Sequence, residues 1–468
     1  MKKTQIVSAD ISLLENRAVS VPVIPKEEFE ARLCALREKM RAEELSHVVV
    51  YADREHFSNM YFLTGYDPRF EEALLIVGAA EGDVPTLLVG NEGYDYCFIS
   101  PLELKRVLYQ NFSLQGQPRD RLRPLEELLR EAGLTEGSRV GIVGMKYFEA
   151  EHIDDCERAI DIPAYILRRI ERVSGGEAVN CTWFMTGGTE GLRMTHSARQ
   201  IAIYEYAACE SSNRLINMLK ALKEGASEIG VSAAAGFDGQ PLCVYPNINF
   251  GAAHLDIGLR SPDLTELKPG MPVMISAALR GSLVCRAGMA ARDEKDYNGE
   301  YEGMLEAFIR PFFETVALWM ESVRIGVCAG DVYTTIKQKL REHNLVSALN
   351  PGHSIAEDEW PNSVFRPGSE HKLVSGMYIQ SDIIAGRAEG AALTGIFEDG
   401  FVLADEKLRA ELAAQYPETW ERMQIRRRFM KEVVGLDIAE ELLPMSNLCG
   451  VYFPFLMDLG RVFALREE

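Results

Sequence analysis

Short apolar runs bounded by turn residues characterise the first third of the chain. Four of these runs have the length of buried strands: HVVVYA at 47–52, ALLIVG at 73–78, TLLVG at 86–90 and RVGIVG at 139–144. Apolar residues also recur at helical spacing over 29–40, and a helix with proline in its first turn is predicted near 124–132. Strands that alternate with helices predict an α/β domain over residues 1–172.

Longer periodic segments follow a glycine-rich stretch. The stretch VSGGEAVNCTWFMTGGTEG, residues 173–191, carries five glycines and little periodicity, so we expect a linker there. Beyond it the pattern predicts a long helix over 201–222, a β-hairpin at 275–291, helices near 301–323 and 330–343, strands over 376–404, and a helix over 406–434. Residues 192–468 are therefore expected to form a second domain, which ends in an apolar C-terminal extension.

The chain is acidic, with 70 Asp and Glu against 50 Lys and Arg and a formal net charge of −20. A nucleic-acid backbone binds a basic face, so this balance excludes nucleic acid as a partner. The densest basic run, residues 426–428, falls on a predicted helix, where we expect a solvated face. No apolar run reaches the ~18 residues of a membrane-spanning helix, and we expect no membrane association.

The cysteine pattern bears on the compartment. Nine cysteines lie singly along the chain, and no two of them form a Cys-x-x-Cys pair. This pattern is typical of buried free thiols in a reducing environment, so we predict a cytoplasmic protein.

Two histidines and two acidic residues stand in distinctive local settings. His254 lies in the Gly/Ala-rich segment NFGAAHLDIG, and His353 follows Pro-Gly in NPGHSIAEDEWP. Asp382 lies in the otherwise apolar segment GMYIQSDIIAG, where a buried carboxylate needs a partner. Glu398 lies in the next predicted strand, GIFEDGFVLADE. Such a set suits either a metal site or acid–base catalysis, and the spacing does not decide between them.

The order of these segments resembles that of the creatinase/prolidase/aminopeptidase P family, which has the pita-bread fold. NMYFLTGYDPRFEEALLIV resembles the family's strand and turn in the first domain. LRMTHSARQIAIYEYA resembles the start of a helix in its second domain, with His196 at a lysine position. ALKEGASE, GAAH, PGHSIA, GMYIQSDI and GIFEDGFVLADE then follow in the family's order. The resemblance covers nearly the whole chain. It implies an α/β N-terminal domain of the creatinase/prolidase type and an α+β pita-bread C-terminal domain.

The resemblance also indicates which residues to compare with the family's metal ligands. The family's metallopeptidases bind two metal ions through two Asp on one hairpin, a His and two further acids. The His and the two acids correspond to His353, Asp382 and Glu398 here. The two hairpin positions correspond to Ser276 and Ala287, which keep the ten-residue gap and lack both carboxylates.

The whole hairpin, ISAALRGSLVCRAGMAA at 275–291, contains no acidic residue, and Arg286 stands beside the second lost position. Two divalent ions need anionic oxygens to offset their charge and complete their coordination. We therefore expect that the dinuclear centre is absent and that the protein has no cofactor. A single divalent ion on the remaining His and two acids is the alternative.

The chain is similar in this respect to creatinase, a metal-independent branch of the family, which also lacks the hairpin Asp pair. Its catalytic histidine corresponds to His254. The arginine that binds its substrate carboxylate corresponds best to Arg366. An arginine suits this role because its guanidinium forms two parallel hydrogen bonds with a carboxylate. Its guanidinium-binding glutamate corresponds to Met289, so we do not expect creatine as the substrate. In creatinase-like homodimers the partner's first domain closes over the site, and Arg69 and Phe70 are the candidates for that role.

The leading hypothesis is a metal-independent, creatinase-like hydrolase of a small carboxylate-bearing C–N compound, active as a homodimer. His254 would be the general acid and base, while Glu398 and Asp382, hydrogen-bonded to His353, would bind a cationic nitrogen or orient water. One alternative is an Xaa-Pro aminopeptidase or prolidase with a reduced metal site. The other is a non-catalytic small-molecule-binding protein on the same scaffold.

Overall fold

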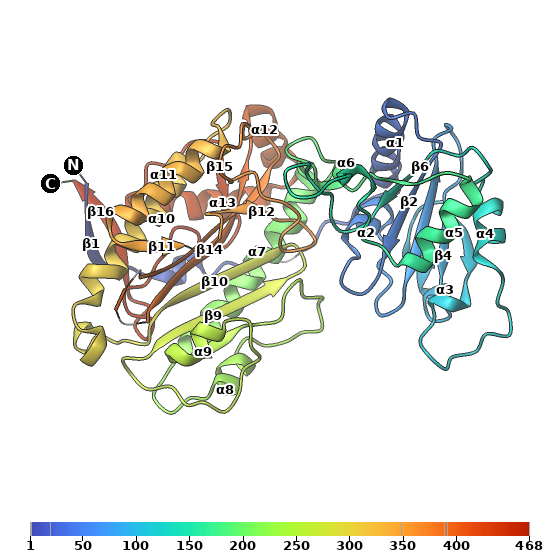
Figure 1. Ribbon diagram of the computed structural model, residues 1–468. Coiled ribbons are helices and arrows are strands. Elements are labelled where there is room, and N and C mark those ends of the chain that lie inside the picture. Colours follow the sequence, from blue (N-terminus) through green and yellow to red (C-terminus); the bar gives the residue numbers. More distant parts are fainter. Residues whose placement is uncertain (1, 19, 348, 388, 391, 468) are drawn as a thin grey trace. The chain divides into compact units, whose positions relative to one another are not determined.

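The computed structural model describes residues 2–18, 20–347, 349–387, 389–390 and 392–467. The chain divides into two compact units, one of residues 23–194 and one of residues 195–468 together with residues 1–22 (Figure 1). This division corrects the expected boundaries at two places. Residues 1–22 leave the expected N-terminal domain because β1 (Lys2–Ser8) pairs along its whole length with β16 (Arg461–Glu467). Residues 173–191 are no free linker, because Cys181, Phe184 and Met185 are buried in the core of the unit 23–194.

The unit 23–194 is a mixed sheet with a hydrophobic cluster on each face. Its strands, in the sheet order β5–β4–β3–β2–β6–β7, are Lys105–Leu108, Thr86–Val89, Ala73–Gly78, His47–Ala52, Val140–Val143 and Val179–Asn180. Its helices are α1 (Lys26–Ala42), α2 (Ser58–Thr64), α3 (Gly93–Tyr96), α4 (Leu125–Glu131), α5 (Ala164–Ser174) and α6 (Trp183–Thr186). Val48 and Val50 pack with α1 and α2, whereas Val49 and Tyr51 pack with α4 and α5. The alternation of side chains along β2 thus gives the predicted α/β domain both of its faces.

One motif of this unit has a different conformation from the predicted one. The segment expected as a strand and turn forms α2, which ends at Gly65 in the left-handed conformation with φ 74°. Glycine adopts this conformation without a steric penalty, so the helix stops there and the chain turns toward β3.

The second unit is built on a larger antiparallel sheet. Its main path runs β11–β13–β14–β10–β9–β8, with β12 paired to β13 and β15 paired to β14. These strands are β8 (Ile248–Phe250), β9 (Pro272–Leu279), β10 (Ser282–Met289), β11 (Leu345–Ser347), β12 (His353–Ser354), β13 (Tyr378–Arg387), β14 (Thr394–Leu403) and β15 (Leu442–Pro444). The helices are α7 (Ala198–Lys220), α8 (Glu228–Ala233), α9 (Ala252–Ile257), α10 (Arg310–Ser322), α11 (Ala329–Glu342), α12 (Glu406–Gln415) and α13 (Pro417–Arg428). The hairpin and the long helix predicted from the sequence are thus β9–β10 and α7.

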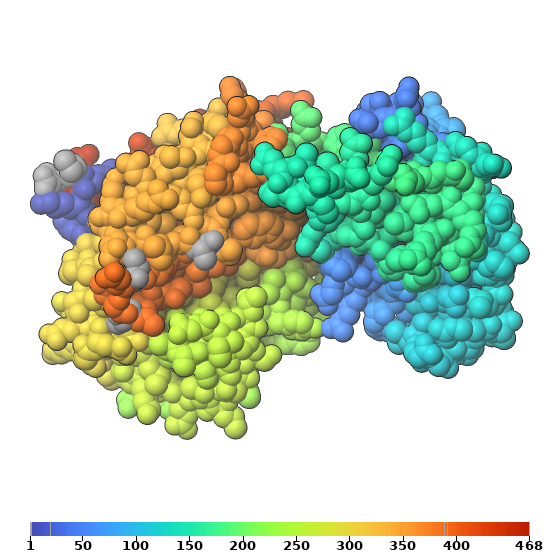
Figure 2. Space-filling view, in the orientation of Figure 1, coloured from blue at the N-terminus to red at the C-terminus, as the bar shows by residue number. Residues whose placement is uncertain are grey.

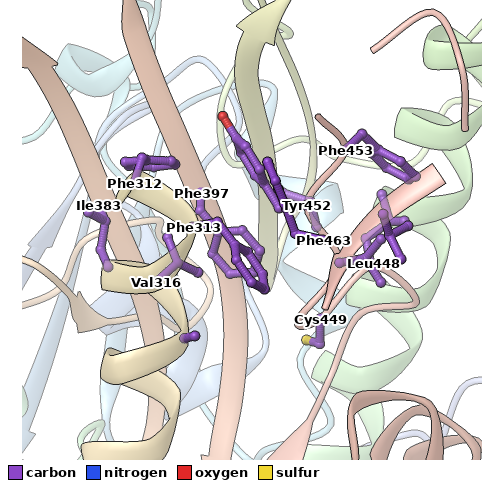
Figure 3. Packing of buried hydrophobic residues seen from close by; sticks show 14 of the residues in the cluster. Phe312, Phe313, Val316, Ile383, Phe397, Leu448, Cys449, Tyr452, Phe453 and Phe463 are labelled. Atoms are coloured by element: carbon purple, nitrogen blue, oxygen red, sulfur yellow. The ribbon is translucent and has the colours of Figure 1, made fainter. Parts of the chain in front are cut away.

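The C-terminal extension completes the core on one face of this sheet. Figure 3 shows Phe312, Phe313 and Val316 of α10 together with aromatic side chains of the extension, around Phe397 of β14. Tyr452 and Phe453 are almost completely buried there. The apolar C-terminal segment is therefore part of the hydrophobic core. Its high apolar content reflects this burial.

The basic run at 426–428 is not the solvated face that the sequence suggested. Arg426 and Arg427 are buried, and Nη1 of Arg426 lies 2.6 Å from Oε1 of Glu205, a fully buried residue of α7. Arg422, one helical turn earlier, also pairs with Glu205. The acidic partner comes from a distant segment, so the run alone gave no sign of burial.

Large apolar side chains are exposed along the segment that contains α8 and α9. They are Ile229, Phe237, Tyr245, Ile257, Leu259 and Leu264. Figure 2 shows this segment as the yellow-green part of the surface. Since α9 carries His254, this candidate residue lies beside an exposed region of the unit.

The expectations about membrane-spanning helices and about cysteines can also be compared with the structure. No helix among the described residues is long and apolar enough to cross a bilayer. All nine cysteines are free thiols, of which five are buried: Cys97, Cys181, Cys209, Cys285 and Cys449. Cytoplasmic localisation stays a prediction.

Candidate functional site

His353 is the buried centre of the candidate site. It lies on the two-residue strand β12, directly after Pro351-Gly352, and its side chain has no exposed surface. Nδ1 lies 2.9 Å from the carbonyl oxygen of Ser354. A carbonyl only accepts, so Nδ1 carries a proton, and in the neutral imidazole Nε2 has the lone pair. Nε2 has no hydrogen-bond partner among the described residues.

Asp382 and Glu398 face this imidazole from two neighbouring strands. They are directly opposite each other in the β13–β14 pair, so both side chains project from the same face of the sheet. Nε2 of His353 lies 3.9 Å from Oδ2 of Asp382 and 3.9 Å from Oε1 of Glu398. The structure therefore brings together three of the four residues that the sequence analysis placed in the catalytic set.

The environment of these two carboxyl groups favours their protonated forms. Burial raises the pKa of Asp382 well above its usual range, and the charge of Glu398 adds to the effect. Burial likewise raises the pKa of Glu398, to which the charges of Glu359 and Asp399 contribute. The hydrogen bond from Gln380 offsets a part of that rise in pKa.

Glu359 is a fourth member of this group, and its place here was not predicted from the sequence. Its Oε1 lies 3.2 Å from Nε2 of His353, and burial raises its pKa. The next residue, Trp360, stacks on the His353 ring with 4.0 Å between the ring centroids. The available signal was the acidic triplet Glu-Asp-Glu that follows the Pro-Gly-His motif in the sequence.

The hairpin β9–β10 presents uncharged side chains to the same face of the sheet. Cys285 lies opposite Glu398 on one side and opposite Ser276 on the other. Ala287 follows two residues after Cys285 and shares its face. Oγ of Ser276 accepts a hydrogen bond of 2.8 Å from the backbone N–H of Asn247, and Ala287 packs in a small apolar cluster with Met274. The two sequence-predicted positions thus lie on the face of the two acids.

A dinuclear metal centre does not fit these residues. Two divalent ions need several anionic oxygens, and the hairpin offers no carboxylate at this face. A single ion fits better, because donor atoms of His353, Asp382 and Glu398 lie within 4.8 Å of one another. Nε2 of His353 and Oδ1 of Asp382 are buried and have no hydrogen-bond partner among the described residues, so both atoms are available as ligands.

Arg286 does not contribute to this balance, although the sequence places it beside the site. Its side chain points to the opposite face of the sheet, where it is fully buried and pairs with Asp399. Its Nε also donates to the carbonyl oxygen of Val451 at 3.1 Å, and the guanidinium stacks 4.0 Å over Phe397. Arg286 therefore fixes the C-terminal extension to the sheet. Arg286 is beside Ala287 in the sequence but not at the site, because neighbours along a strand alternate in direction.

His254 belongs to a second, separate group of side chains. Its Nδ1 lies 2.8 Å from Oε1 of Glu228, a fully buried carboxylate of α8. The same carboxylate accepts hydrogen bonds from Nη1 of Arg260 at 2.7 Å and from the N–H of Asp263 at 2.9 Å. Asp263 pairs with Arg260 in turn, and its hydrogen bonds lower the pKa of its carboxyl. Leu255, the residue after His254, packs on the cluster that contains Ala287 and Cys285.

Known structures show which fold carries these two groups. The sequence matches no protein-family model and no curated protein. The structure is similar to a prolidase from Pyrococcus horikoshii, with TM-score 0.61 and 15% identity over 80% of this chain and 95% of that one. It is also similar to dipeptidase PepE from Mycobacterium ulcerans, with TM-score 0.60 and 16% identity over 81% and 94% of the two chains. The chain has the pita-bread fold. The fold expected from the sequence, with its α/β N-terminal domain, is thereby confirmed.

A subunit of the FACT complex contains a similar structure. The N-terminal domain of FACT complex subunit SPT16 from Cicer arietinum is similar to this chain, with TM-score 0.57 and 11% identity over 82% and 95% of the two chains. At such low identities the similarity defines the fold, while the function must be argued from the site.

The remaining candidates lie outside the two groups just described. Arg366 is half-buried in the segment between β12 and β13 of the pita-bread unit. Arg69 and Phe70 belong to the unit 23–194, and both are exposed. Nε of Arg69 donates to the hydroxyl of Tyr96 at 3.2 Å. Substrate-binding roles for these three residues stay predictions.

Proposed function

We propose that the protein is a hydrolase that cleaves a C–N bond of a small carboxylate-bearing compound without a dinuclear metal centre. The observation that carries this proposal is the strand register. It keeps Asp382 and Glu398 beside His353 while the hairpin places Ser276 and Ala287 at the same face. Titratable groups thus remain where the fold's metallopeptidases have theirs, although the bridging carboxylates are gone.

In the creatinase-like form of the proposal, no metal takes part and His254 is the general acid and base. Nδ1 of His254 lies 2.8 Å from Oε1 of Glu228 and 3.0 Å from Nη1 of Arg260. In the tautomer whose Nδ1–H donates to the Glu228 carboxylate, Nε2 is the basic atom. Nε2 would take a proton from water as the oxygen attacks the carbon of the C–N bond. The same proton would then pass to the leaving nitrogen. Arg366 would hold the substrate carboxylate.

The second candidate is an Xaa-Pro peptidase that uses one divalent ion. It is favoured by the two unpartnered buried atoms, Nε2 of His353 and Oδ1 of Asp382. His353, Asp382 and Glu398 would hold the ion, which would supply Lewis-acid activation of the scissile carbonyl. Oxygen and imidazole ligands of this kind suit manganese or zinc.

The third candidate is a non-catalytic binding protein. A pita-bread domain that is part of a FACT complex subunit supports this candidate, since it places the fold in a complex rather than in a described peptidase. A small-molecule ligand would then bind at the same face of the sheet without being cleaved.

Elemental analysis of the purified protein, followed by a hydrolysis screen, separates these candidates. The screen would cover acyl amino acids, amidines and Xaa-Pro dipeptides, each with wild type and His254→Ala. The creatinase-like form predicts turnover that resists chelators and is lost in His254→Ala. Chelator-sensitive cleavage of Xaa-Pro dipeptides would support the second candidate, and binding without turnover would support the third. Equal turnover by wild type and His254→Ala would remove His254 from the mechanism.

We also propose that the protein is a cytoplasmic homodimer. The basis is the resemblance to creatinase-like homodimers and the single, free cysteines. Light scattering of the purified chain measures the oligomeric state. A monomer at all concentrations would leave Arg69 and Phe70 without the covering role that the resemblance gives them.

A further inference from the structure

We propose that the site has an apolar subsite beside its two acids, and that the nitrogen of the substrate carries an aliphatic chain that lies on it. The apolar subsite is the set of apolar side chains next to the acids on the same face of the sheet. Its members are Ala287, Met274, Ile396, Ile384 and Leu255. The inference names the substrate class of the proposed hydrolase and rests on that proposal for its catalytic meaning. The subsite itself is tested by binding alone.

The first argument is the strand register, which places an apolar pair beside the acidic pair. Asp382 and Ile384 are two residues apart on β13, and Glu398 and Ile396 are two residues apart on β14. Residues two apart on a strand point to the same face. Ile384 and Ile396 lie directly opposite each other, as the two acids do. The apolar pair is therefore the next row of the sheet after the acidic pair.

The hairpin β9–β10 extends this apolar row. Ala287 lies opposite Ile396 on one side and opposite Met274 on the other. Ala287 is also two residues from Cys285, which lies opposite Glu398 in the row of the acids. The apolar row thus crosses β13, β14, β10 and β9, and none of its four side chains can carry a charge.

The apolar subsite is separate from the main hydrophobic core of the pita-bread unit. Intervening residues of the same strands, Val284, Ile383 and Phe397, belong to the large cluster on the other face of the sheet. The subsite belongs to a small cluster of its own, in which Ile384 and Leu255 are only half-buried. A ligand that covers these two side chains with an apolar group removes further apolar surface from water.

The acids supply the contact for the nitrogen of the ligand. Oδ1 of Asp382 is buried and has no hydrogen-bond partner among the described residues. An N–H group of the ligand would donate to this oxygen, and a positive nitrogen would offset the charges of Asp382 and Glu398. Residues two apart on a strand are separated by about 6.6 Å, a length that a chain of about five carbon atoms covers. An aliphatic amine of this length therefore reaches from the acids across the apolar subsite.

Calorimetry of the chelator-treated protein tests the subsite with propylamine, butylamine and pentylamine. The amine is the leaving group of the proposed reaction, so its binding requires no turnover. We expect the affinity to rise about fourfold for each added CH₂ group, because each group buries a similar apolar area. Pentanoate, which has the opposite charge, should bind at least about tenfold more weakly than pentylamine. No binding of the amines, an affinity independent of chain length, or equal binding of pentanoate would overturn the proposal.

The variants Ile384→Ser and Leu255→Ser remove the two half-buried side chains of the subsite. Each should reduce the gain for each CH₂ group to less than about twofold. The matched control is Ile99→Ser, which makes the same change as Ile384→Ser at an exposed position of the unit 23–194 and should leave the gain unchanged. Asp382→Asn should weaken the binding of all three amines by a similar factor. Thermal unfolding checks that each variant is folded, and equal effects of Ile99→Ser and Ile384→Ser would overturn the proposal.

The results for the subsite and for the hydrolase are distinguishable. Amine binding that depends on chain length, without hydrolysis of any N-alkyl amide, would support the subsite and contradict the proposed function. Hydrolysis of N-alkyl amides with no dependence on chain length in either binding or turnover would support the hydrolase and overturn the subsite.

Discussion

At the scale of single residues, the adjacent Cys285 and Arg286 have different roles because their side chains lie on opposite faces of the sheet. Cys285 faces the carboxylates, and burial beside Glu398 raises the pKa of its thiol well above the usual range. Arg286 faces the core, where it binds the side chain of Asp399 and the carbonyl oxygen of Leu448. The site is thus built on one face of a strand whose other face holds the molecule together.

We predict that Arg286→Met destabilises the protein by about 3–5 kcal/mol, because it leaves Asp399 as an uncompensated buried charge. Urea unfolding measures the change. The control is Arg139→Met, whose exposed pair with Glu44 should matter by about 0.5 kcal/mol or less. A loss for Arg286→Met no larger than that of the control would contradict the structural role.

The raised pKa values of Asp382 and Glu398 predict a pH dependence of stability. Both groups hold protons more tightly in the folded than in the unfolded state. Their stabilising contribution is therefore fully present below the unfolded pKa and is lost as the pH rises through the folded pKa. In chelator, Asp382→Asn should gain stability relative to wild type between pH 5 and pH 8, on the order of 1 kcal/mol. Urea unfolding at both pH values tests this, and a constant difference between the proteins would argue against it.

At the scale of elements, the sequence predicted those site residues whose positions are set by strands and by ordered motifs. The hairpin followed from two apolar runs, and the grouping of His353, Asp382 and Glu398 was implied by the resemblance to the family. The contribution of Glu359 and the Glu228 partner of His254 did not follow. Both depend on which loop or helix packs against a histidine, and that is decided by tertiary contacts with no local periodicity. The burial of the basic run at Arg426 was not predicted for the same reason, because its acidic partner Glu205 is far away in the sequence.

The turn of the hairpin offers a test at this scale. Gly281 has φ 97°, and a Cβ there would lie 2.7 Å from Cδ1 of Tyr204. Gly281→Ala should therefore destabilise the protein by about 1–3 kcal/mol. Gly326→Ala is the control, because it has φ 86° with nothing within 4 Å. Thermal unfolding of both variants isolates the contact, and equal losses would show that backbone strain alone is responsible.

At the scale of the whole molecule, the pita-bread unit is discontinuous in sequence. Residues 1–22 belong to it, and residues 23–194 form the other unit between them and the rest. β1 makes its pairing with β16, so both ends of the chain contribute to one two-stranded sheet. Sequence periodicity could not reveal this, because short terminal strands pair with whichever edge the fold brings near.

We predict that removing residues 2–8 lowers the midpoint of unfolding of the pita-bread unit and leaves the other unit unchanged. β16 would lose its only strand partner among the described residues, while the unit 23–194 keeps its whole sheet. Hydrogen exchange followed by mass spectrometry resolves the two units. Faster exchange in β2 and β3 as well would show that the two units do not unfold independently.

The pairing of β1 with β16 also orders events during synthesis. Residues 2–8 are translated long before residues 461–467, so β1 waits for its partner while the rest of the pita-bread unit is made. The unit 23–194 is complete much earlier and can fold while the ribosome is still at work. A ribosome that stalls before residue 461 would therefore release a chain with one folded unit and an unpaired strand. Such an edge is a template for aggregation, so the synthesis of residues 461–467 removes this hazard by giving β1 its partner.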